Sequence, residues 1–160
     1  GISIELESGE TIETSLIVGA DGANSQIREL MRLSIREWSY GQDAFVTHVY
    51  TEKSHGGLAR QCFNEQGPLA YLPMNLADGH VSSIVWSASP VFVDHLQQLS
   101  RAEVAALLGD GLEEALGRVE AVADRFSFPL RQRHARHYVA EGVALIGDAA
   151  HTIHPLAGQG

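Results

Sequence analysis

Alternating apolar and polar positions open the chain. Residues 2–6 alternate in this way, and Ser8-Gly9-Glu10 separates them from a second short segment at 11–14. Strands that are buried on one face alternate with a period of two, and Gly-containing turns join antiparallel neighbours. This stretch therefore predicts a β-hairpin.

Two continuous apolar runs follow at opposite ends of the chain. Leu16-Ile17-Val18 leads into Gly19-Ala20-Asp21-Gly22, and residues 143–146 lead into Gly147-Asp148. Short apolar runs of this kind are typical of strands buried on both faces. After the first run, Asn24 or Ser25 is expected to cap a short helix that extends to about Leu33.

The middle of the chain changes to strand-like segments separated by Gly, Pro, Asn and Asp. Four such segments are 44–50, 60–63, 69–74 and 81–87. Ser100 and Glu103 have the spacing of a capping box, which predicts a helix through Leu108. A further helical turn or two is expected at 112–116, and extended structure returns at 126–130 and at 137–139.

The predicted fold class is α/β (α+β), in which part of a Rossmann-like domain is interrupted by a mostly antiparallel β-sheet. The expected boundaries place residues 1–37 and 126–160 in the nucleotide-binding part and 38–125 in the sheet-rich insert. Ligands of open α/β sheets bind beyond the carboxyl ends of strands, where both Gly/Asp turns are expected to lie.

Composition narrows the class of partner. The chain has 160 residues, 44% hydrophobic content and a net charge of −9 from 11 basic and 20 acidic residues. This charge argues against nucleic-acid binding and against simple electrostatic attachment to a membrane. The one cysteine, Cys62, and the lack of a long apolar run favour a reducing, cytoplasmic setting. The first residue is not Met and the last is a glycine of a turn, so both ends are interpreted as interior to a longer protein.

The two turns contain the residue types that bind sugars and phosphates. Asp21 and Asp148 offer carboxylate acceptors for hydroxyl groups, while Gly22 and Gly147 permit backbone conformations closed to other residues. Pro155 stiffens the loop after the second turn. The glycines at 158 and 160 leave the backbone open to a ligand at a helix start, where negative charge is stabilised.

The segments 19–28 and 147–160 resemble the second and third fingerprints of the flavoprotein aromatic hydroxylases related to p-hydroxybenzoate hydroxylase. This resemblance implies that FAD is the cofactor and that NAD(P)H is the reductant. It implies the following cofactor-binding residues: Asp21, Gly22, Arg28, Gly147, Asp148, Pro155, Gly158, Gln159 and Gly160. The glycine-rich Gly-x-Gly-x-x-Gly turn of the family occurs nowhere in the chain, so this chain alone is expected to bind flavin poorly.

Further segments resemble the branch of the family that hydroxylates ubiquinone precursors, most closely 2-polyprenylphenol hydroxylases, with the sister hydroxylases for other ring positions as near alternatives. They are 66–74, 83–87, 128–130 and 151–160. This resemblance implies a monooxygenase that transfers oxygen from O2 to the ring of a polyprenylated phenol. It also implies transient contact with the membrane, a peripheral location at the inner membrane, and other ubiquinone-biosynthesis proteins as partners.

Two alternatives remain open: a flavin reductase or dehydrogenase of the same fold that inserts no oxygen, and a non-catalytic scaffold of a biosynthetic complex. No general base is identified. Candidates for the wall facing the substrate ring are Tyr71, Leu72, Pro73 and Met74, although strand residues of this kind are more often core.

Other chemistry-bearing residues favour ordinary structural roles. The pairs His134/His137 and His151/His154 are spaced i, i+3, which in extended structure places them on opposite faces, so no metal is expected. Cys62 is interpreted as a small buried hydrophobe. The basic run 131–134 is interpreted as a solvated strand face, with a minor role in attracting NAD(P)H phosphates as the alternative.

Overall fold

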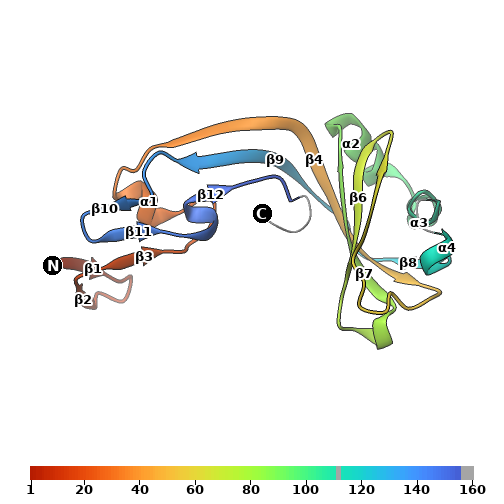
Figure 1. Ribbon diagram of the computed structural model, residues 1–160, viewed down its shortest axis with the longest axis horizontal. Helices are drawn as coiled ribbons and strands as arrows, with labels where there is room; N and C mark the ends of the chain where they lie inside the picture. Colours follow the sequence, from red (N-terminus) through yellow and green to blue (C-terminus); the bar gives the residue numbers. More distant parts are fainter. Residues whose placement is uncertain (111–112, 156–160) are drawn as a thin grey trace. The chain divides into compact units, whose positions relative to one another are not determined.

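The computed structural model describes residues 1–110 and 113–155 and divides into two compact units. Unit 1 comprises Gly1–Tyr40 and Arg131–Gly160, and unit 2 comprises Gly41–Leu130. The expected boundaries, after residues 37 and 125, lie a few residues before this division. The mixed α/β class with a large antiparallel sheet is confirmed (Figure 1).

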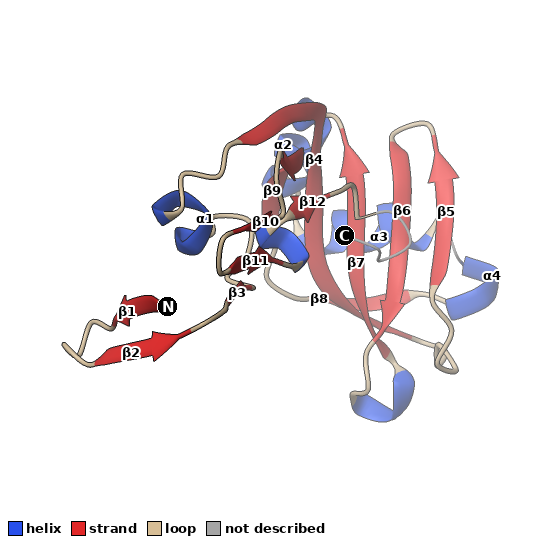
Figure 2. Ribbon diagram, turned by 60° about the vertical axis from the view of Figure 1, so that its left-hand side comes forward, coloured by secondary structure: helices blue, strands red, loops and turns tan. Residues whose placement is uncertain are grey.

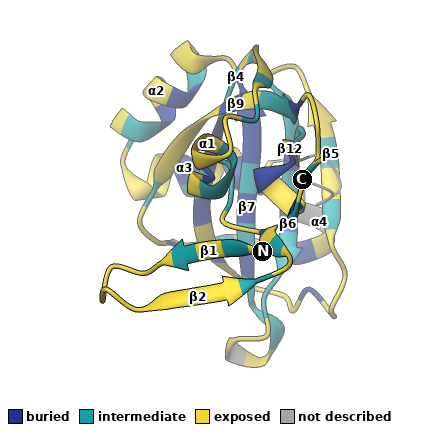
Figure 3. Cartoon of the chain, turned by 90° about the vertical axis from the view of Figure 1, so that its left-hand side faces the viewer, coloured by how far each residue is buried: buried dark blue, intermediate teal, exposed yellow. Residues whose placement is uncertain are grey.

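Unit 1 begins with the predicted hairpin. Strands β1 (Ile2–Glu5) and β2 (Thr11–Thr14) are antiparallel, with Ile4 opposite Ile12. Figure 3 shows this hairpin in the colours of exposed and half-buried residues.

The two apolar runs of the sequence pair with each other. Strand β3 (Ile17–Gly19) lies parallel to β11 (Val143–Leu145), with Leu145 opposite Gly19, and β10 (Val139–Ala140) is antiparallel on the other side of β11. Val143 and Leu145 are buried. The prediction that the first run is also buried is wrong: Leu16 is 54% exposed and Val18 50%. β3 is an edge strand of this three-stranded sheet, and these two side chains are not covered by the described residues.

Helix α1 (Gln26–Leu30) follows β3 and is shorter than predicted. Ser25 is its N-cap, since the Ser25 hydroxyl accepts a hydrogen bond from the Arg28 N–H at 2.9 Å. The helix ends because Arg32 takes the left-handed conformation, with φ of 54°. Two short elements complete the unit: the 3-10 turn η2 (Gly147–Ala149) and strand β12 (His151–Thr152), which pairs with the end of β9 (Phe126–Ala135).

Unit 2 is built on an antiparallel sheet whose strands run side by side (Figure 2). The spatial order is β4 (Ile35–Thr51), β7 (Val81–Ala88), β6 (Gly67–Pro73) and β5 (Arg60–Asn64), and β8 (Val119–Val122) pairs with the end of β4. The 3-10 turn η1 (Ala77–Gly79) precedes β7. All four strands predicted from the middle of the chain are confirmed, and β4 is longer than expected.

Three helices pack on one face of this sheet. They are α2 (Pro90–Gln98), α3 (Arg101–Gly109) and α4 (Glu113–Leu116). The predicted capping box at Ser100 and Glu103 is confirmed. The core joins alternate strand residues to the helices: Phe45, Val49, Leu69, Tyr71, Ile84, Trp86, Val93, Leu96, Val104, Leu108 and Leu116.

One glycine is required where β3 meets α1. A Cβ atom at Gly19 would lie 2.9 Å from Leu145 Cδ2 and 3.1 Å from Ile27 Cγ2. Such contacts are too close for carbon atoms, so a larger residue requires the packed side chains of Leu145 and Ile27 to shift.

Substituting Gly19→Ala should therefore lower the free energy of unfolding by about 1–3 kcal/mol, the usual cost of overpacking. Gly109→Ala is the matched control, because an added Cβ there meets nothing within 4 Å. Urea unfolding of both variants measures the difference. Equal stability of Gly19→Ala and the parent would show that this close approach is unimportant.

Candidate functional site

The two Gly/Asp turns lie side by side in unit 1. Each turn follows one of the paired parallel strands β3 and β11, and the Ile146 N–H donates to the Gly19 carbonyl at 2.9 Å. Parallel strands end at the same edge of a sheet. Asp21 and Asp148 therefore lie at the same edge, although they are more than a hundred residues apart in the sequence. The sequence predicted this edge as the ligand-binding position.

Asp21 organises the start of helix α1. Its carboxylate accepts the Ile27 N–H at 3.0 Å. Although partial burial acts to raise it, the pKa of Asp21 is lowered by hydrogen bonds from the Ser25 hydroxyl and from the Ile27 backbone. The carboxylate is therefore kept ionised beside the free N–H groups of the helix start.

Arg28 joins the two turns. Its guanidinium donates to the Ala149 carbonyl at 2.9 Å and to the Ala23 carbonyl at 2.8 Å. Both acceptors are backbone atoms, one in each turn. In the structure this predicted cofactor residue therefore holds the two turns in register.

Asp148 is placed differently from Asp21. It lies on the exposed turn η2, and within 1–110 and 113–155 its carboxylate makes no hydrogen bond or ion pair. The flanking Ala149 and Ala150 are buried, and Gly147 has φ of 55° with open space where a Cβ would point. An unpaired carboxylate above small residues is suited to accept hydroxyl groups of a ligand.

The segment after β12 is fixed by aromatic contacts that the sequence did not predict. The Tyr40 hydroxyl accepts the His154 N–H at 3.2 Å and donates to Gln132 Oε1 at 2.6 Å, and the Tyr40 and His154 rings meet edge to face at 5.1 Å. Burial lowers the pKa of His154. These contacts determine where Pro155, which is half-buried, begins the predicted flavin loop.

The structure leaves part of the predicted site undescribed. Gly158, Gln159 and Gly160 lie outside the described residues. Gly22 lies in the first turn with φ of 82°, and an added Cβ there would meet nothing within 4 Å. The fit to a flavin therefore rests on Asp148, the small residues beside it, and Thr152, whose buried hydroxyl has no hydrogen-bond partner in the described part of the chain.

The four candidate wall residues of unit 2 do not share one environment. Tyr71 is 2% exposed, and its hydroxyl donates to the Leu108 carbonyl at 2.5 Å, so it lies on the helix-covered face. Burial also raises the pKa of Tyr71. Leu72 alternates to the opposite face, where it is half-buried and pairs with Ser83. Pro73 and Met74 are half-buried at the end of β6, and Met74 bonds through its carbonyl to His55.

The remaining candidates have structural surroundings. Cys62 is half-buried in β5, and burial raises the pKa of its thiol. The His134 ring stacks on the His151 ring. This contact joins one histidine from each of the two i, i+3 pairs of the sequence. No group of three or more His, Cys, Asp or Glu suited to a metal was found in the described residues. In the same part of the chain, no helix is long and apolar enough to cross a membrane.

Comparison with known proteins identifies the class. A family model described as "FAD binding domain" matches residues 3–160. The chain therefore belongs to the family of FAD-binding domains, as the parallel strands and their two turns suggest.

Individual relatives narrow the resemblance. The chain is 42% identical over 157 residues to the 3-demethoxyubiquinol 3-hydroxylase of Escherichia coli, covering 98% of this chain and 39% of that protein. It is 43% identical over 160 residues to the ubiquinone hydroxylase UbiL of Rhodospirillum rubrum, covering all of this chain and 37% of that protein. The human ubiquinone biosynthesis monooxygenase COQ6 is 34% identical to this chain over 194 aligned positions. The alignment covers 99% of this chain and 41% of COQ6. The chain thus spans about two fifths of the length of these relatives.

A solved structure has the same fold. PqsL of Pseudomonas aeruginosa, described as a probable FAD-dependent monooxygenase, superposes with a TM-score of 0.80 at 24% identity, covering 99% of this chain and 44% of that one. At this identity the likeness concerns the fold alone.

The bridge at Arg28 predicts a specific defect. Replacing Arg28 with Lys keeps the charge but leaves one ammonium group to reach two carbonyls, so one carbonyl loses its partner. We expect unfolding to become easier by about 1–3 kcal/mol, measured by urea titration. Arg32→Lys is the control, since the Arg32 side chain makes no hydrogen bond or ion pair with the described residues. An unchanged midpoint for Arg28→Lys would contradict the bridging role.

Asp21 predicts a dependence of stability on pH. Its folded-state pKa lies below the usual 3.8, so its contribution is complete above that value and is lost as pH falls through the lowered pKa. The Tm of the parent should therefore fall more steeply than the Tm of Asp21→Asn as the pH is lowered from about 6 to about 2.5. This range includes the usual pKa of an aspartate carboxyl group. Parallel curves for the two proteins would show that the ionised carboxylate does not stabilise α1.

Proposed function

We propose that this chain is part of an FAD-dependent monooxygenase that hydroxylates the ring of a polyprenylated phenol in ubiquinone biosynthesis, using NAD(P)H and O2. The single observation that carries the proposal is the pairing of the two fingerprint turns at one sheet edge, with Asp148 unpaired. The relatives named as ubiquinone hydroxylases support the pathway.

Some residues of unit 1 contact FAD directly in this proposal, and others hold the two turns in place. Asp148 accepts hydrogen bonds from ribityl hydroxyls, and the small side chains of Ala149 and Ala150 let the cofactor approach the backbone. Asp21 and Arg28 act through the turns, because Asp21 accepts an N–H of the first turn of α1 and Arg28 holds both turns together. FAD, when bound, supplies the redox and oxygen chemistry.

The sheet of unit 2 provides the wall that orients the substrate ring and excludes water. We assign this role to the face that bears Leu72, because Tyr71 is enclosed by the helices on the other side. The same face carries Ala70 and Val85, which are paired across β6 and β7 and are half-buried. An apolar wall of this kind suits a substrate with a phenol ring and an isoprenoid tail.

The test uses the full-length protein and measures oxygen uptake with NADH or NADPH and a prenylated phenol. Uptake that depends on the phenol is expected. A well-folded full-length protein that contains no flavin would exclude the proposed function.

Removal of the Asp148 carboxylate separates an enzyme from a scaffold. Asp148→Ala should weaken flavin binding by about 1–3 kcal/mol, since the ribityl hydroxyls lose an acceptor, and should reduce oxygen uptake. Glu141→Ala is the control, because it removes an exposed acid from the turn at the other end of β11, which is not assigned to the site. Flavin titration followed by fluorescence measures both variants. Equal affinities would contradict the role of Asp148.

A further inference from the structure

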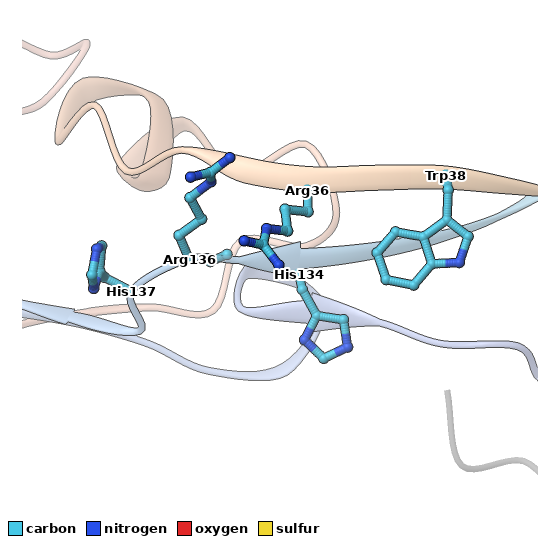
Figure 4. A pocket seen from close by; sticks show the side chains of 6 residues that line it. Arg36, Trp38, His134, Arg136 and His137 are labelled. Carbon is cyan, nitrogen blue, oxygen red and sulfur yellow. The ribbon is translucent and has the colours of Figure 1, made fainter.

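A hollow in unit 1 lies beside the segment assigned to the flavin, since the N–H of Ala135 in its lining donates to the Ala150 carbonyl at 2.8 Å. Its volume is about 520 Å3. Arg36 and Trp38 of β4 line it on one side, and residues 134–137, from the end of β9 and the turn that follows, line it on the other (Figure 4). The Arg136 N–H donates to the Ser34 carbonyl at 2.8 Å, so the two segments are held side by side.

Two arginines of this hollow carry uncompensated charge. Within the described residues, the guanidinium groups of Arg36 and Arg136 have no hydrogen bond or ion pair, and no carboxylate lines the hollow. Arg36 lies on β4 and Arg136 directly after β9, and both side chains are exposed to solvent. An anion between them would pair with both charges.

Two neighbouring arginines, Arg131 and Arg133, already have an acidic partner. Arg131 and Arg133 alternate to the other face of β9, where both bind the Glu37 carboxylate, Arg131 at 2.7 Å. These hydrogen bonds, first from Arg131 and then from Arg133, lower the pKa of Glu37. Arg133 also donates to Asn24 at 3.0 Å. Arg131 and Arg133 are therefore paired, whereas within the described residues the two arginines that line the hollow, Arg36 and Arg136, are not.

Beside the arginines lies a flat aromatic wall. Trp38 is 47% exposed and stacks on His134 with ring centres 6.3 Å apart and an angle of 10° between the planes. His134 stacks in turn on His151 at 5.7 Å, and its Nδ1 lies 3.0 Å from the Tyr138 hydroxyl. The stack holds the indole in a fixed orientation with part of its surface open.

We infer that this hollow binds a nucleotide, with its phosphate between Arg36 and Arg136 and its base against Trp38. Guanidinium groups form paired, charge-assisted hydrogen bonds to phosphate oxygens. Aromatic rings that are held in place bind planar bases by stacking. This inference concerns binding alone and does not depend on the proposed hydroxylation.

The experiment is a calorimetric titration of the full-length protein, saturated with FAD, with AMP, adenosine or inorganic phosphate. AMP is expected to bind more tightly than either fragment. Arg36→Gln and Arg136→Gln should each weaken AMP binding about tenfold or more, because each loses a charge-assisted contact. Arg32→Gln is the matched control for loss of one exposed arginine and should bind AMP as the parent does.

Trp38→Leu tests the second half of the site. It should weaken AMP binding and leave the binding of inorganic phosphate unchanged. Circular dichroism confirms that each variant is folded, and the flavin content of each is measured at the same time. The inference is overturned if the parent does not bind AMP, if the Arg36 and Arg136 variants match the Arg32 variant, or if Trp38→Leu binds AMP as tightly as the parent. None of these outcomes alters flavin-dependent oxygen uptake, so the proposed function is judged separately.

Discussion

The parallel pairing of β3 with β11 is the constraint on which the candidate site depends. Leu145 lies opposite Gly19, and each strand runs directly into its Gly/Asp turn. Gly19 allows α1 to approach, and Arg28 of that helix then bonds to the backbone of both turns. The close packing of β3, α1 and β11 therefore brings together two turns that are far apart in the sequence.

In unit 2, the environment of each candidate wall residue depends on which face of the sheet its side chain occupies. Neighbouring residues of β6 face opposite sides of the sheet, so Tyr71 is enclosed by helices while Leu72 is not. Trp86 also lies on the helix-covered side, where its ring meets Phe92 edge to face at 5.0 Å. The proposed substrate wall is therefore assigned to the Leu72 face, because the buried aromatic residues Tyr71 and Trp86 lie on the helix-covered face.

The fold could largely be predicted from the sequence because its signals are local. The hairpin, the strands of the insert and the capping box at Ser100 all follow from periodicity and turn residues. Helix α2 was missed, although Ser89 at the N-cap, Pro90 in the first turn and Val93 and Leu96 at helical spacing indicated it. The burial of Leu16 and Val18 was predicted wrongly, because exposure depends on which elements pack against the faces of a strand.

The candidate site was only partly predictable. Asp21 and Asp148 were found because their residue types follow strands, yet their different roles depend on hydrogen bonds that no spacing reveals. The contacts of Arg28 and Tyr40 join residues about a hundred positions apart, so no local pattern could indicate them.

Oxygen insertion is the step that distinguishes the proposed monooxygenase from a flavin reductase of the same fold. The most direct measurement is mass spectrometry of the phenolic product formed by the full-length protein under 18O2. A hydroxylase is predicted to give a product that carries one 18O atom from dioxygen. Oxidation of NAD(P)H with no 18O in the product would contradict the proposal.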